Sequence, residues 1–151
     1  MLTRLAFLLF SALTVFGQTL SASSASGTAG QTVDIEVSLL PGKGLPPASL
    51  KWEVIYPAQL VEFVSPPLSG AATMDAGKSL ACAPGRTYSH LCLVAGGRMP
   101  LAGGTVAILH FKIRSDAHPG NCTIRIDHID AVTSDLKAVK LTGQEGQIEI
   151  Q

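Results

Sequence analysis

Apolar and polar residues alternate strictly over residues 32–40, and this pattern predicts a half-buried β-strand. The run reads T-V-D-I-E-V-S-L-L, so every second side chain from Val33 to Leu39 points to one face. The same period of two returns over residues 50–56, where Trp52 and Tyr56 share the apolar face, and Pro57 ends the run. Further strand candidates are residues 61–65, 80–83, 91–95, 105–114, 122–129, 136–141 and 147–150.

Proline and glycine separate these candidate strands and predict many tight turns. The turn signals lie at residues 41–44, 66–67, 84–85, 102–104 and 119–120. Only residues 58–60 and 134–137 have the pattern of a single helical turn, and neither has an extended amphipathic stripe. The sequence contains no internal repeat and no low-complexity linker. We therefore predict one all-β domain, a sandwich or a barrel, over residues 18–151.

Residues 1–17 have the pattern of a secretory signal peptide. Arg4 supplies the positive charge, and the apolar run over residues 5–16 is too short for a stable membrane span. Val15 and Gly17 are the small residues expected at a cleavage site, so cleavage after Gly17 would leave Gln18 as the new N-terminus. An uncleaved anchor is the alternative. No second long apolar run follows, so we expect a secreted or cell-envelope protein with no membrane span after cleavage.

The cysteines fit an exported protein. Cys82 and Cys92 lie in two strand-like runs on either side of the Pro84-Gly85 turn signal, and we expect them to form a disulfide. Closing a loop of about ten residues stabilises a fold by roughly 2.5 to 3 kcal/mol in the chain-entropy model. Two buried free thiols are the alternative. Cys122 is expected to be a small core residue.

Charge and motifs exclude several classes of function. Eleven basic residues balance eleven acidic ones without a basic run, which argues against nucleic-acid binding. We find no nucleophile elbow, zinc-protease motif, P-loop or dinucleotide-binding glycine pattern, and therefore predict no enzyme. The four histidines are scattered and no CxxC occurs, so we expect neither a metal site nor a cofactor. Asp127 and His128 lie in the densest ionisable cluster, but strand neighbours face opposite ways unless a bulge intervenes.

Three segments, in this order, are similar to segments of one known protein family. Residues 27–35, G-T-A-G-Q-T-V-D-I, are similar to the entry strand of cohesins, and residues 50–65 to the aromatic strand and its continuation. Residues 104–120, G-T-V-A-I-L-H-F-K-I-R-S-D-A-H-P-G, are similar to a later strand and turn. The resemblance implies a jelly-roll β-sandwich of about nine strands, a fold shared with some cellulose-binding modules, and implies a module that binds dockerins.

Cohesins meet dockerins through a flat sheet face, and the resemblance locates the corresponding positions in this chain. Ser49 and Lys51 occupy positions where cohesins have Asn or Asp, and Ala95 occupies a position that is acidic in the family. The partner of this chain, dockerin or another protein, therefore stays open.

The sequence thus predicts a secreted, non-catalytic recognition module that binds a protein partner through an exposed sheet face. The expected contact residues are outward strand positions and neighbouring loop positions, namely Lys51, Glu53, Ile55, Arg86, Tyr88 and Arg98. Ile55 has two interpretations, because an outward apolar residue either forms the centre of a contact or packs under a loop. A role in extracellular polysaccharide degradation is part of this prediction.

Direct binding of polysaccharide is the alternative function. It requires exposed aromatic rings on which sugars stack, whereas Trp52, Tyr56 and Phe111 lie on apolar strand faces and are expected in the core. Only Tyr88, in the loop with Arg86, is expected to be exposed. With a single exposed aromatic ring, we expect at most a weak affinity for sugars.

Overall fold

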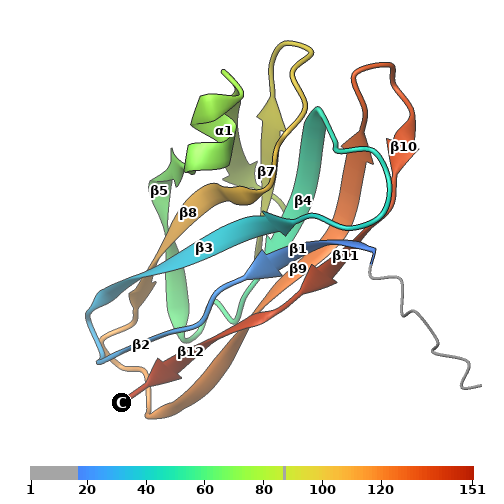
Figure 1. Cartoon of the computed structure of the whole chain (residues 1–151). Helices are drawn as coiled ribbons and strands as arrows, with labels where there is room; N and C mark the ends of the chain where they lie inside the picture. Colours follow the sequence, from blue (N-terminus) through green and yellow to red (C-terminus); the bar gives the residue numbers. More distant parts are fainter. Residues whose placement is uncertain (1–16, 87) are drawn as a thin grey trace, which may run out of the picture.

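The computed structural model describes residues 17–86 and 88–151, which form a β-sandwich with one short helix (Figure 1). The predicted signal peptide therefore lies, up to residue 16, outside the described residues. The described elements, in chain order, are β1 (Gln18–Ala22), β2 (Ala25–Gly27), β3 (Thr32–Leu40), β4 (Ser49–Ile55), β5 (Val61–Ser69), α1 (Ala71–Asp75), β6 (Ser79–Pro84), β7 (Ser89–Ala95), β8 (Gly104–Ile113), β9 (Gly120–Val132), β10 (Ala138–Val139), β11 (Leu141–Gln144) and β12 (Gly146–Ile150).

Two sheets form the layers of the sandwich. One has the strand order β11-β1-β3-β8-β5, and the other has the order β2-β12-β9-β4-β7-β6, with β10 paired to β9. Figure 1 shows α1 and the loop after β7 at one end of the sandwich and the C-terminus at the other. The predicted all-β jelly-roll sandwich is confirmed.

The core lies between the sheets and is filled by the apolar face of each alternating strand. Val33, Ile35, Val37 and Leu39 of β3 are buried, as predicted. In the opposite sheet, β4 contributes Leu50, Trp52 and Val54, each fully buried, and beside β3 in the same sheet, β8 contributes Leu109, Phe111 and Ile113. Tyr56 and Cys122 are also buried, so the predicted core positions of these residues are confirmed.

The N-terminal segment takes part in both sheets, an arrangement that the sequence pattern did not predict. β1 pairs with β3 and, in parallel, with β11, where Gln18 lies opposite Leu141. β2 then pairs in parallel with β12 in the other sheet, where Gly27 lies opposite Ile150. Both strands are short and rich in Ser, Thr and Ala, so they lack the long apolar alternation that indicates a strand. β1 and β2 are added to the predicted strands, and the one strand expected over residues 136–141 is two short strands, β10 and β11, so twelve strands are described where about nine were expected.

Two predicted boundaries are wrong. Pro66 and Pro67 were expected to end a strand, but β5 continues through them to Ser69 with a register shift between Val64 and Leu68. Proline is tolerated there because β5 is an edge strand, where a missing backbone N–H need not break a ladder on both sides.

The start of the strand predicted over residues 136–141 is also wrong. Leu136 has a φ of +62° and an 82% exposed side chain, and its N–H donates to the Thr133 carbonyl at 3.0 Å within a turn. Strand pairing begins only at Ala138. The turn dominates because Asp135 and Lys137 bond to the Thr133 side chain, which gives the backbone a local alternative to a strand.

Helix α1 was not predicted, and the two expected helical turns are not helices. α1 spans five residues from Ala71 to Asp75 and is followed by Gly77 at a φ of +66°. It is too short to show a helical period. Residues 58–60 and 134–135 are hydrogen-bonded turns instead. Within residues 17–86 and 88–151, no helix is long and apolar enough to cross a membrane.

Candidate functional site

The exposed surface of β6, β7, β4 and β9 forms a continuous patch that we call the outer face. Every second residue of β4, namely Leu50, Trp52 and Val54, is buried. The residues between them must therefore point outward, onto the outer face. Strand pairing brings the outward residues of the four strands side by side. The outer face consists of Lys51, Glu53, Ile55, Ala81, Ala83, Leu91, Leu93, Arg125, Asp127, His128 and Asp130.

One half of the outer face is apolar. Leu91 and Leu93 of β7 are 42% and 44% exposed. Across the ladder to β6, Leu91 lies opposite Ala83, and Leu93 lies opposite Ala81. These four side chains form a contiguous exposed apolar patch on an otherwise polar surface, a feature that marks interaction sites.

The predicted disulfide lies directly behind this apolar half. Cys82 and Cys92 are opposite each other in the same ladder, with an S–S distance of 2.06 Å and a Cα–Cα distance of 4.1 Å. Cys92 is fully buried. The bond joins the edge strand β6 to β7 between the two Ala–Leu pairs, and it confirms the predicted pairing.

The other half of the outer face is charged, and its charges pair with one another. Lys51 Nζ lies 3.1 Å from Asp130 Oδ2, and Arg125 Nη2 donates to Asp127 Oδ2 at 3.0 Å. His128 Nδ1 lies 2.7 Å from Glu53 Oε2. The surface therefore has many charged groups but little uncompensated charge.

A β-bulge in β9 makes the third pair possible. Between Lys51 and Glu53 of β4 there is one residue, whereas the opposing positions Asp130 and Asp127 enclose two. His128 sits in the bulge with a φ of +47°, and its N–H donates to Asp127 Oδ1 at 2.8 Å. The bulge that the sequence left open is thus present. It places the His128 ring beside Glu53 on the outer face.

Glu53 is held in its charged form by its surroundings. The Ser89 hydroxyl contributes most to lowering the pKa of this carboxyl, and His128 and the positive charge of Arg86 lower it further, against a smaller opposing effect of burial. Its side chain is only 14% exposed. Glu53 is therefore a fixed, partly covered anion rather than a proton donor.

The structure distributes the predicted contact residues over three places. Lys51, Glu53 and Ile55 lie together on the outer face. Arg86 and Tyr88 lie in the turn before β7, next to the end of β4, where Tyr56 N–H donates to the Tyr88 carbonyl at 3.0 Å. Arg98 is exposed in the loop after β7, at the end where Figure 1 shows α1, and so is far from Tyr88.

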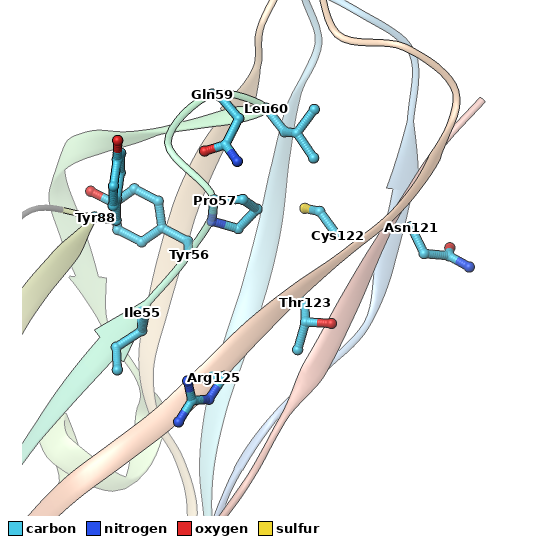
Figure 2. Close-up of a pocket in the computed structure, with 10 residues that line it drawn as sticks. All are labelled: Ile55, Tyr56, Pro57, Gln59, Leu60, Tyr88, Asn121, Cys122, Thr123 and Arg125. Carbon is cyan, nitrogen blue, oxygen red and sulfur yellow. The ribbon is translucent and has the colours of Figure 1, made fainter.

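A groove of about 560 Å³ opens at the Tyr88 end of the outer face, and we call it the terminal groove (Figure 2). Its lining consists of Ile55, Tyr56, Pro57, Gln59, Leu60, Tyr88, Asn121, Cys122, Thr123 and Arg125. In Figure 2 the segment around Pro57 and Leu60 faces Cys122 and Thr123 of β9, while the Asn121 amide points away. Ile55 and Arg125 belong to both the groove and the outer face.

Apart from Tyr88, the aromatic side chains of the described residues are buried in the core. Tyr56 and Phe111 meet edge to face, with ring centroids 5.2 Å apart, and Phe63 stacks on His90 at 3.9 Å. The buried ring of Trp52 leaves its indole N–H without a hydrogen-bond partner among the described residues. Tyr88, 54% exposed, is the one exposed aromatic ring in the described part of the chain, as expected.

Leu91 and Leu93 were not predicted to be surface residues. They lie in a run, L-C-L-V-A, that reads as a wholly buried strand. The signal was the disulfide, because an inward Cys92 requires outward neighbours on both sides. Within the described residues, no group of three or more His, Cys, Asp or Glu side chains is arranged to hold a metal ion.

Solved cohesin structures share this fold over nearly the whole described chain. A non-cellulosomal cohesin from the hyperthermophilic archaeon Archaeoglobus fulgidus is 16% identical, with a TM-score of 0.76 over 90% of this chain and 92% of that chain. The sixth cohesin of scaffoldin B from Acetivibrio cellulolyticus, solved in complex with a Cel5 dockerin mutant, is 20% identical, with a TM-score of 0.77 over 90% and 100%. The cohesin CaCohA2 from Clostridium acetobutylicum is 18% identical, with a TM-score of 0.74 over 91% and 92%.

No protein-family model matches the chain, and no curated protein sequence matches it. The agreement with solved structures is one of backbone architecture at 16 to 20% identity. The chain therefore has the cohesin fold, as the resemblance in its sequence implied.

Proposed function

We propose that this protein is a non-catalytic recognition module that binds another protein through its outer face. The observation that carries the proposal is the exposed apolar patch of Ala81, Ala83, Leu91 and Leu93, set beside charges that are already paired. Apolar residues flanked by polar ones are the usual composition of a protein interface.

The shared fold supports a protein as the partner. Cohesins of this fold from Acetivibrio cellulolyticus and Clostridium thermocellum are solved in complexes with dockerins. Whether the partner of this chain is a dockerin is a separate matter, because Ser49, Lys51 and Ala95 differ from the residue types at the corresponding cohesin positions. Export to the cell envelope or beyond is part of the proposal. The disulfide and the signal-like residues 1–17 support it.

The test is capture of a partner on the immobilised protein from the secreted fraction of the producing organism, followed by calorimetry with the purified partner. The Leu91→Asp/Leu93→Asp variant is expected to lose at least tenfold in affinity, since two charges would replace the apolar centre of the contact. The matched control is Leu40→Asp/Leu68→Asp, which changes two leucines of similar exposure on the outer side of the other sheet. Equal loss in both variants, or in neither, would contradict the proposal.

Polysaccharide binding is the alternative, and only Tyr88 among the described residues offers an exposed ring for it. Insoluble cellulose and other polysaccharides are tested in parallel with the protein fraction. Retention on a polysaccharide that is lost in Tyr88→Ala would favour this alternative, because stacking on the ring would then carry the binding.

A further inference from the structure

We propose that the terminal groove is the anchor site of the outer face and takes an apolar side chain of the partner that lies beside a carboxylate. The inference rests on the proposed function, because Ile55 and Arg125 belong to both surfaces. A partner seated on the outer face therefore reaches the groove without a gap.

The apolar part of this ligand is inferred from the lining. Ile55, Pro57 and Leu60 contribute aliphatic surface, and the Tyr88 ring stands at one side (Figure 2). The volume of about 560 Å³ lies within the range of roughly 300 to 1,000 Å³ that is typical of small-ligand sites. A single large side chain, aromatic or branched, would be removed from water there.

The carboxylate is inferred from the charge of the lining. Arg125 is the one charged residue among the ten that line the groove, and no acidic side chain lines it. One guanidinium nitrogen donates to Asp127, which lies outside the groove. A guanidinium has five N–H donors, and within the described chain this is the one hydrogen bond found for the Arg125 side chain. An incoming carboxylate would thus meet unused donors on a planar group that suits two parallel hydrogen bonds.

The location at an apolar wall strengthens this pairing. Gln59 and Thr123 are uncharged polar residues at the rim and can bond to the backbone of a bound segment. The Arg125 side chain is 54% exposed in the free protein, so an apolar group seated beside it would remove part of the guanidinium from water and strengthen its attraction for the carboxylate. The groove therefore selects for the combination of an apolar group and an anion.

The test is a chemical-shift titration of the ¹⁵N-labelled protein with N-acetyl-phenylalanine and with N-acetyl-phenylalaninamide, which lacks the charge. We expect the acid to shift the amide signals of Ile55, Leu60 and Thr123, with a dissociation constant on the order of a millimolar for so small a ligand. The amide probe should bind at least threefold more weakly. In Arg125→Gln the two probes should bind equally, whereas Lys51→Gln, a cation on the same face outside the groove, should keep the difference.

Equal binding of the two probes to the unchanged protein, or shifts confined to residues outside the groove, would overturn the inference. So would shifts of the same signals by cellobiose but not by the acid, because the groove would then be a saccharide site. The spectrum of each variant reports its folding directly. If the probes fail while Leu91→Asp/Leu93→Asp still loses the partner, the inference is wrong and the proposed function stands. If instead the probes bind as expected but Leu91→Asp/Leu93→Asp keeps the partner, the proposed function is wrong, and the groove binds its ligand without being an anchor site of the outer face.

Discussion

At the scale of single residues, His90 is a partly buried titratable side chain that packs against the aromatic residues of the core. Its ring stacks on Phe63, and its Nδ1 lies 2.8 Å from the Tyr56 hydroxyl. A neutral imidazole with its proton on Nε2 accepts a hydrogen bond from the Tyr56 hydroxyl at Nδ1, whereas a protonated ring can only donate at that position. Burial lowers the pKa of His90 below its ordinary value of 6.5.

This burial predicts a loss of stability in mild acid. The pKa of His90 is lower in the folded chain than in the unfolded chain, so the contribution of neutral His90 to the free energy of unfolding is complete above pH 6.5. This contribution is lost as the pH falls below 6.5, because the unfolded chain then takes up a proton that the folded chain does not. Urea unfolding should therefore show a lower midpoint at pH 5.5 than at pH 7.5, and His90→Phe, which keeps the stacking, should reduce the difference. His118→Gln, at an exposed histidine, serves as the control, and an identical effect of both substitutions would count against this account.

Residues on regular strands were predictable, and residues in special conformations were not. The inward positions of Trp52, Phe111 and Cys122 follow from a period of two, which the physics of a pleated strand imposes. His128 and Leu136 have positive φ values although neither is glycine, and no local pattern announces this. In both cases side-chain hydrogen bonds from neighbours stabilise the conformation, and such bonds depend on the folded surroundings.

At the scale of elements, β6 depends on its disulfide more than other strands do. It is one of the two edge strands of its sheet, it pairs on one side with β7, and its sequence, S-L-A-C-A-P, buries little surface. Lys78 supports its beginning, where Nζ donates to the Gly96 carbonyl at 2.7 Å. The ladder and the covalent bond together keep Ala81 and Ala83 beside the leucines of β7.

Removing the disulfide should destabilise the protein by roughly 2.5 to 3 kcal/mol, the loop-closure entropy of about ten residues. Urea unfolding of Cys82→Ser, compared with the oxidised protein, measures this loss. The unchanged protein in a dithiol reductant should match the variant, because both lack the same cross-link. Cys122→Ser is the control for a general thiol effect, since Cys122 is unpaired, and reductant should shift its midpoint as it does in the unchanged protein. An unaltered midpoint in Cys82→Ser would show that β6 is held by its ladder alone.

The strands, like the residues, separate into those that their own sequence predicts and those that depend on their neighbours. Long alternating strands such as β3, β4 and β8 were predicted almost to the residue, since each carries its own pattern. β1, β2 and β11 are strands because neighbours provide hydrogen bonds to them, and their own sequences are mostly polar or small. The outer face shows the same division. Lys51, Glu53 and Ile55 were found from β4 alone, whereas the leucines of β7 were missed although the predicted disulfide, by placing Cys92 inward, indicated that they face outward.

At the scale of the whole molecule, the outer face differs from the outer side of the other sheet. There the exposed leucines, Leu40 and Leu68, lie on β3 and β5, which β8 separates. Asp34 and His110 form a pair there at 2.6 Å. Only the outer face combines adjacent exposed leucines with a neighbouring row of mutually paired charges among the described strands.

This arrangement predicts that partner binding depends little on salt. Lys51, Arg125 and the acidic residues of β9 compensate one another, so little long-range field is available to attract a charged partner. Raising sodium chloride from about 0.05 to 0.5 M should change the affinity for the captured partner by less than about threefold. Lys51→Glu, which removes one compensating charge, should make the affinity visibly salt-dependent. A tenfold loss in the unchanged protein would indicate an electrostatic contact instead.

The pairing of the first strands with the last ones has a consequence for how the chain is made. Residues 18–27 find their parallel neighbours in residues 141–150, so contacts that close both layers span almost the full described length. Such distant contacts form late and slowly. A chain still in synthesis, or cut short before residue 141, would carry β1 with one of its two neighbours and β2 with none of its ladder. Completion of the sandwich must therefore wait until residues 141–150 have been made and are free to pair.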